Sequence, residues 1–195
     1  AMTQEAHVTG HISKRFDQEL EDIRNQVLAM GGLVERQLEM AVTSLSNGES
    51  EAAETVVSND YKVNACDVEI DEMCTNILAL RQPTASDLRL VLAVIKTTAD
   101  LERIGDEAKR VARMAIRAAA ADHGRNLFNQ IVHLGSQVKQ MLRSALDAFA
   151  RMDVDAAVAV AHEDVNIDRE YESVMRQSMT YMMEDPRSIP NVLDL

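Results

Sequence analysis

Aromatic residues, glycine and proline are scarce in this chain. Only 3% of its 195 residues are aromatic, none is tryptophan, and it has seven glycines and three prolines. β-Strands are recognised as runs of β-branched and aromatic residues bounded by turn signals, and the sequence offers no such runs. The composition therefore predicts an all-α protein.

The chain also lacks long apolar runs and an excess of basic residues. No stretch of about 18 apolar residues could form a spanning helix, and the N-terminus shows no secretory signal. The formal net charge is −12. Nucleic acids and anionic membrane surfaces both select clustered lysine and arginine, so neither is expected to bind this chain directly.

Cysteine is limited to Cys66 and Cys74. On one helix their spacing of eight residues corresponds to a rise of about 12 Å, too far for a disulfide bond. Unpaired thiols without metal-ligand spacing are typical of the reducing cytosol. We therefore expect both to be core cysteines of a cytoplasmic protein.

Apolar periodicity and punctuation by Gly and Pro predict five long helices and the start of a sixth. The ranges are 13–45, 50–81, 84 or 86 to 121, 126–152 and 155–183, with a turn at 186–190. Helices of this length joined by short turns pack as antiparallel bundles.

The sequence repeats itself at an offset of 104 residues. Residues 30–64 align without a gap on 134–168, with identities such as Gly31/Gly135, Val34/Val138 and Leu38/Leu142. A duplicated three-helix unit follows. We expect one bundle over residues 1–122 and a second over 123–195. The second would lack most of its last helix, of which Val192, Leu193 and Leu195 form the opening.

Two carboxylates, Glu102 and Asp106, stand one turn apart on the third predicted helix. Like charges at this spacing repel by roughly 0.2–0.5 kcal/mol, so the pair favours a nearby cation, either Lys109 or Arg110 or a metal ion. Both acids continue an outward apolar strip that begins at Leu88.

Further acids recur at helical spacing in both halves. They are Asp60, Asn64, Asp67 and Asp71 on the second predicted helix, and Asp164 and Asp168, with Glu172 one turn on, in the second half. If the second and third helices pack antiparallel, the first group could approach Glu102 and Asp106. Oxygen ligands suit Mg²⁺, Ca²⁺ or Mn²⁺, and carboxylates also bind iron and zinc.

The same spacing is also typical of a solvated helix face. Asp106–Arg110 and Arg103–Glu107 would then be ordinary surface ion pairs. Signals of catalysis are weak, because the histidines are scattered and no Glu-x-x-His pair or phosphate-binding glycine loop occurs.

Several strings nevertheless resemble one family. Gln82-Pro-Thr-Ala-Ser-Asp-Leu-Arg89, Leu101-Glu-Arg-Ile-Gly-Asp106 and Met179-Thr-Tyr-Met-Met-Glu-Asp-Pro186 are similar to the signatures of the PhoU family of phosphate-transport accessory and regulatory proteins. The resemblance covers nearly the whole chain. It implies two tandem three-helix bundles with E/D-x-x-x-D motifs that bind metal clusters in some members, and Glu102-x-x-x-Asp106 matches that motif. The family's second copy of the motif lies on a sixth helix that this chain lacks.

The resemblance implies a non-catalytic role in the cytoplasm. Such a protein would couple the ATPase subunit of a phosphate ABC transporter to a phosphate-sensing histidine kinase, keep phosphate-starvation genes off, and meet the membrane only through these partners. The alternatives are a carboxylate-bridged metal enzyme, which would turn over substrate with added metal, and a metal-storage bundle. We also expect a homodimer formed through residues 126–195, because the stripe from Ile167 to Tyr181 lacks a covering helix.

Overall fold

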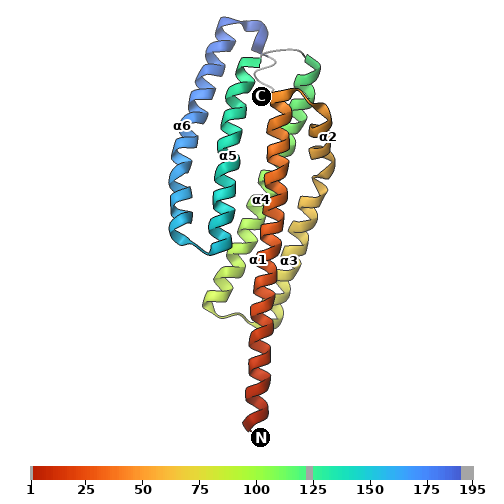
Figure 1. Cartoon of the computed structure of the whole chain (residues 1–195), viewed down its shortest axis with the longest axis vertical. Coiled ribbons are helices and arrows are strands. Elements are labelled where there is room, and N and C mark those ends of the chain that lie inside the picture. Colours follow the sequence, from red (N-terminus) through yellow and green to blue (C-terminus); the bar gives the residue numbers. More distant parts are fainter. Residues whose placement is uncertain (1, 122–124, 190–195) are drawn as a thin grey trace. The chain divides into compact units, whose positions relative to one another are not determined.

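The computed structural model describes residues 2–121 and 125–189. Over this range the chain forms α-helices and one short 3₁₀-helix, and it contains no strand. In order they are α1 (Met2–Asn47), α2 (Ser50–Asn59), α3 (Tyr61–Arg81), α4 (Ala85–Ala121), α5 (Arg125–Arg151), α6 (Val154–Glu184) and the 3₁₀-helix η1 (Pro186–Ser188), as Figure 1 shows. The all-α prediction is confirmed.

Helix boundaries differ from the predicted ones at three places. α1 begins at Met2 instead of near Ser13. The second predicted helix is divided at Asp60 into α2 and α3, although Asp60 itself keeps right-handed backbone angles (φ −55°, ψ −35°). The turn predicted after Asp185 is a 3₁₀-helix that starts with Pro186. The opening of a sixth helix at 192–195 and the domain boundary at 122–123 both lie outside the described residues.

The chain divides into two compact units. The first comprises the residues up to Gly32 together with Tyr61–Arg103, and the second comprises Leu33–Asp60 and the residues from Ile104 onward. α1 and α4 each contribute to both units. This division does not test the boundary at residues 122–123 that we expect between the two sequence repeats, so that boundary stays a prediction.

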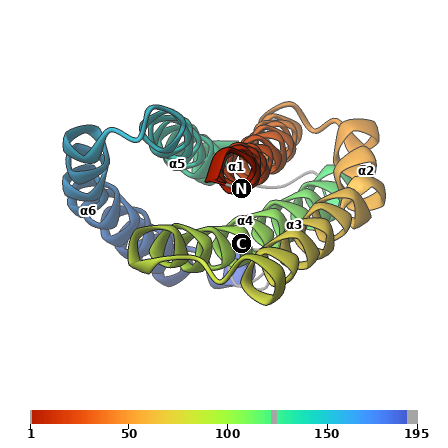
Figure 2. The ribbon, with the colours of Figure 1, turned by 90° about the horizontal axis from the view of Figure 1, so that it is seen from below.

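The first unit contains the early part of α1, all of α3 and the early part of α4, which lie side by side (Figures 1 and 2). Its core consists of apolar side chains at helical spacing, because each helix turns one stripe inward. They are Ile23, Val27, Met30, Val63, Ile70, Cys74, Ile77, Val91, Val94 and Leu101. At one end Arg81 of α3 binds Glu19 of α1 through two hydrogen bonds, of 2.5 and 2.8 Å.

The second unit contains the later part of α1, α2, the later part of α4, α5 and α6. α5 and α6 are antiparallel neighbours (Figure 1). α5 also packs closely on α1, because Gly135 has no side chain where a Cβ would stand 2.7 Å from Cγ2 of Val42. Two ion pairs join the same helices, Lys139–Glu39 at 2.8 Å and Arg143–Glu35 at 3.1 Å.

The two sequence repeats use the same local structure after their first helices. α2 begins at Ser50 and α6 at Val154, which are 104 residues apart. The residues preceding them, Glu49 (φ −89°, ψ 103°) and Asp153 (φ −92°, ψ 99°), have nearly the same backbone conformation. Asp153 also caps α6 with its side chain, which accepts a hydrogen bond from the Ala156 amide at 2.9 Å. Among the described residues, no helix has both the length and the apolar character needed to cross a lipid bilayer.

Candidate functional site

Glu102 and Asp106 stand one turn apart on α4, on the strip that the sequence places outward. Leu88 and Leu92 at the start of this strip are exposed, at 38% and 46% of their maximal surface. Glu102 is half-buried and Asp106 is exposed. The strip therefore faces away from the helix's own core, as predicted, and ends in a half-buried and an exposed carboxylate.

The two cations expected near this pair bind other acids. Lys109 donates a hydrogen bond from Nζ to Oδ2 of Asp60. Arg110 pairs with Glu107 at 2.9 Å, not with Asp106 as the spacing suggested. Neither cation therefore makes the ion pair that its spacing from Glu102 and Asp106 suggested.

Asp60 is the acid of the α2–α3 row whose surroundings are most distinctive. It is only 5% exposed, at the junction of α2 and α3, and the ammonium group of Lys109 lies against its carboxylate. A buried carboxylate needs such a partner, since an unpaired charge in the interior is strongly disfavoured. The structure therefore gives Asp60 a structural role in joining α4 to this junction.

The other predicted ligands lie on more open surfaces. On α3, Asn64 and Asp71 are exposed and Asp67 is half-buried. On α6, Asp164 and Asp168 are exposed. Glu172, one turn beyond Asp168, pairs with Arg176 at 3.5 Å.

These eight side chains do not converge in the structure. In the part of the chain it describes, no three His, Cys, Asp or Glu side chains are grouped closely enough to hold a metal ion. A divalent cation bound by Glu102 and Asp106 would need water or another molecule for its remaining ligands. The arrangement as placed thus does not fit a metal site built by protein side chains alone, and metal binding stays a prediction.

The two cysteines are free, and their surroundings oppose ionisation. Cys74 is buried, and burial together with the charge of Asp71 raises its pKa to about 11. Burial and the nearby Glu69 also raise the pKa of Cys66. Since the thiolate is the reactive form, neither side chain is set up as a nucleophile.

A shallow groove between α1 and α3 is a feature that the sequence did not reveal. It is lined by Glu19, Asp22, Ile23, Met73, Asn76, Ile77 and Leu80. Leu80 is 73% exposed at its edge. The groove encloses about 200 Å³, less than a typical small-molecule site. Its size fits one or two side chains of a partner better than a cofactor.

Gln37 on α1 is a second feature missed from the sequence. It is 3% exposed, and neither its Nε2 nor its Oε1 has a hydrogen-bond partner within the described structure. A buried amide without a partner costs about 1–3 kcal/mol. The signal was present in the repeat, because the equivalent residue 104 positions later is the apolar Met141.

Comparison with known proteins identifies the family. The PhoU domain matches residues 27–115 and again 131–195. The two matches begin 104 residues apart, the same offset as the internal repeat. The chain belongs to the PhoU family. The tandem arrangement inferred from the sequence is therefore the duplication of one PhoU domain.

PhoU relatives and PhoU structures agree with this assignment. The chain is 54% identical over 183 residues to the phosphate-specific transport system accessory protein PhoU of Serratia marcescens, covering 94% of this chain and 75% of that protein. The Escherichia coli K12 protein of the same description is 52% identical over 183 residues, covering 94% and 76%.

Solved PhoU structures share the fold. The crystal structure of PhoU from Pseudomonas aeruginosa matches with a TM-score of 0.89 and 50% identity, over 92% of this chain and 86% of that one. The phosphate transport system regulatory protein PhoU from Streptococcus pneumoniae matches with a TM-score of 0.83 and 29% identity, over 92% and 84%.

Proposed function

We propose that this chain is a non-catalytic accessory protein that regulates phosphate uptake and the response to phosphate starvation. The observation that carries the proposal is the identity of more than half over 94% of the chain to proteins named as accessories of the phosphate-specific transport system. An acidic helical protein with exposed apolar strips suits binding to other proteins better than turnover of a substrate.

The proposed partners follow from the family resemblance. They are the ATPase subunit of a phosphate ABC transporter and the cytoplasmic portion of a phosphate-sensing histidine kinase, so the chain would act in the cytoplasm. The transporter's state would then reach the kinase through this protein, which would keep phosphate-starvation genes off when phosphate is abundant.

Deletion of the gene tests the regulatory role. In high phosphate, a reporter of phosphate-starvation genes should switch on in the deletion strain and return to its basal level when the chain is supplied again. Purified chain should also bind the transporter ATPase or the kinase's cytoplasmic portion. A deletion strain in which the reporter stays repressed would remove the regulatory proposal.

The alternative is a metal-dependent enzyme or metal-storage bundle that uses carboxylates of α4. The half-buried Glu102 and the exposed Asp106, one turn apart, are the observation in its favour. Turnover of phosphate esters on addition of Mg²⁺, Mn²⁺ or Fe²⁺, or uptake of many ions per chain, would support it over the regulatory role.

Self-association is a further part of the proposal. In the stripe that suggested it, Val174 is buried, Ile167 is half-buried, and Tyr171 and Tyr181 are exposed. A homodimer through the second repeat should double the mass measured by light scattering at tens of micromolar. A clean monomer at that concentration would contradict it.

A further inference from the structure

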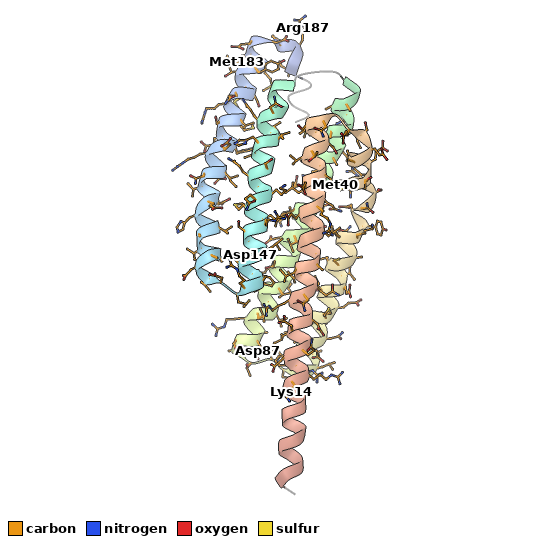
Figure 3. The ribbon with its side chains drawn as sticks, viewed as in Figure 1. Lys14, Met40, Asp87, Asp147, Met183 and Arg187 are labelled. Atoms are coloured by element: carbon orange, nitrogen blue, oxygen red, sulfur yellow. The ribbon has the colours of Figure 1, made fainter. Side chains whose placement is uncertain are left out.

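One face of α6 is apolar where the matching face of α3 is polar. Four residues spaced by four make up this α6 face, which we define as Tyr171, Met175, Met179 and Met183. All four are exposed, at 54%, 40%, 53% and 83% of their maximal surface. Figure 3 labels Met183 near the C-terminal end of α6. A strip of large apolar side chains in water favours binding of another molecule.

The internal repeat shows what this face replaces. The residues 104 positions earlier, on α3, are Asp67, Asp71, Thr75 and Ala79. The core positions of the two helices correspond as well, since Ile70 and its counterpart Val174 are both buried. The second repeat therefore keeps a buried apolar residue at this inward position and replaces two acids, a threonine and an alanine of the outer face by large apolar residues.

Packing against another helix of this chain does not explain why the α6 face is apolar. In the first unit, α3 lies beside both α1 and α4, yet Asp71, Thr75 and Ala79 remain exposed. In the second unit, α6 turns Gln177 and Glu170 toward α5, where they meet Gln130 and Gln137. At 100° per residue the α6 face points away from these contacts. By the repeat, a third helix packed as in the first unit would also leave it open.

The charges beside the face indicate its occupant. α6 carries seven carboxylates and two arginines. Asp168 and Glu172 flank the apolar strip one turn away, and Glu172 shares its charge with Arg176. These negative charges attract a basic partner. A second copy of the chain would place one acidic α6 against another, and an anionic membrane surface would be repelled by the acidic helix.

We propose that the α6 face is the docking surface for a cationic amphipathic helix of a partner protein. Residues four apart form a ridge that packs into the groove of a facing helix. The ridge runs over twelve residue steps, or about 18 Å along the axis, enough for three to four turns of a partner. Methionine side chains are flexible and polarizable, so they adapt to apolar side chains of different shapes. This proposal adds a binding surface to the proposed accessory role. It rests on that role only in expecting the occupant to be a protein.

A face swap built from the chain's own repeat tests the proposal. In the full chain, Tyr171→Asp, Met175→Asp, Met179→Thr and Met183→Ala place the corresponding α3 residues on α6. The probe is a fluorescent 14-residue Leu/Lys peptide with an apolar helical stripe, measured by anisotropy near physiological salt. We expect the swap to weaken binding about tenfold or more, because anchors at the centre of an interface carry most of its energy.

The sign of the effect separates docking from simple attraction. The swap adds two negative charges, so nonspecific electrostatic binding would become tighter, whereas docking on the face becomes weaker. Val158→Glu is the matched control: it introduces the residue of its repeat counterpart Glu54 at a 50% exposed position off the face. This control should bind the peptide as tightly as the unmodified chain. Circular dichroism checks the fold, and Met179→Thr alone should show a smaller loss of the same sign if the swap fails to fold.

Three outcomes would overturn the proposal. The first is equal or tighter binding by the swapped chain, and the second is equal binding of a peptide with the same composition but a shuffled stripe. The third is a dimer in light scattering that the swap converts to a monomer, which would assign this face to the homodimer proposed above; a dimer that survives the swap would leave the face to a different partner. None of these depends on phosphate response, so they can be told apart from failure of the regulatory proposal.

Discussion

Gly48 and Met152 occupy equivalent places in the two repeats and share a left-handed backbone conformation, with φ of +70° and +52°. The turns around them close in the same way. The amide of Glu49 donates to the Ser44 carbonyl at 3.3 Å, and the amide of Asp153 donates to the Ala148 carbonyl at 2.9 Å. Glycine adopts this conformation without steric cost, whereas the Cβ of methionine makes it strained.

The first prediction follows from this difference. Met152→Gly should stabilise the fold by about 1 kcal/mol, because it removes the strain of a side chain in the left-handed region. Gly48→Ala is the matched opposite change and should destabilise by about as much. Urea denaturation followed by circular dichroism measures both. A loss of stability in Met152→Gly would mean that contacts of the methionine side chain outweigh the strain.

Much of the fold could be predicted from the sequence because its signals are local. Scarce aromatics and glycine, long apolar periodicities and the punctuation at Gly48 and Pro83 predicted the helices and their order. The offset of 104 residues predicted the duplication that the PhoU domain matches confirm. Such features depend on neighbours along one helix, and those are visible in a sequence.

The surroundings of the candidate site depended on contacts between helices, and spacing could not reveal them. Asp60 reads as one member of an acidic row, but packing buries it against Lys109, which lies 49 residues away. Gln37 is polar, so helical spacing places it on the surface, and only the apolar Met141 of the second repeat indicates that packing buries its amide. The division at Asp60 was missed for the same reason, since nothing local marks it.

Gly135 should tolerate alanine only when Val42 is made smaller. A Cβ at Gly135 would lie 2.7 and 3.1 Å from the two Cγ atoms of Val42, whose branched side chain is stiff. Overpacking costs about 1–3 kcal/mol, and replacing glycine by alanine within a helix returns about 1 kcal/mol.

Gly135→Ala alone should therefore destabilise by about 1 kcal/mol, the difference between these opposing effects. In the Val42→Ala background the same change should become neutral or stabilising. A double-mutant cycle from thermal or urea unfolding measures the coupling. Equal effects in both backgrounds would show that α1 and α5 do not meet at this point.

The predicted metal ligands can be tested by paired substitutions on α4. Glu102→Ala with Asp106→Ala should abolish uptake of Mn²⁺ or Fe³⁺, measured by elemental analysis after dialysis against the metal. The helix content and metal-free stability should stay nearly unchanged, because two acids one turn apart repel each other slightly. Asp100→Ala with Glu107→Ala removes two exposed acids outside the predicted pair from the same helix and serves as the control. Equal metal content in all three proteins would exclude Glu102 and Asp106 as ligands.

The Arg81–Glu19 pair predicts a dependence of stability on acid pH. The hydrogen bonds and charge of Arg81 lower the pKa of Glu19 below its ordinary value of 4.5. A carboxyl with a lowered pKa in the folded state stabilises above its unfolded pKa, and this contribution disappears as the pH falls through the folded value. Glu19→Gln should therefore cost about 1 kcal/mol at pH 7 and little once the pH lies well below 4.5.

Unfolding of the Glu19→Gln and unmodified chains at pH 7, 5, 4 and 3 measures the convergence. Glu39→Gln provides a comparison, because Lys139 lowers the pKa of Glu39 through a single hydrogen bond on a more exposed side chain. Its effect should be smaller at every pH. A difference between Glu19→Gln and the unmodified chain that persists undiminished to pH 3 would show that the paired charge is not its source.

The buried amide of Gln37 should be a site where substitution stabilises the protein. Gln37→Met introduces the residue that the second repeat has at the equivalent position, Met141, and it keeps a similar length without polar atoms. Removing an unpaired buried amide should raise the free energy of unfolding by about 1–3 kcal/mol. Gln26→Met is the control, because Gln26 is half-buried and donates a hydrogen bond to Glu69 at 3.3 Å, so it should gain nothing from the change. If Gln37→Met instead destabilised the chain, its amide would be bonded in solution, for which a buried water is the simplest partner.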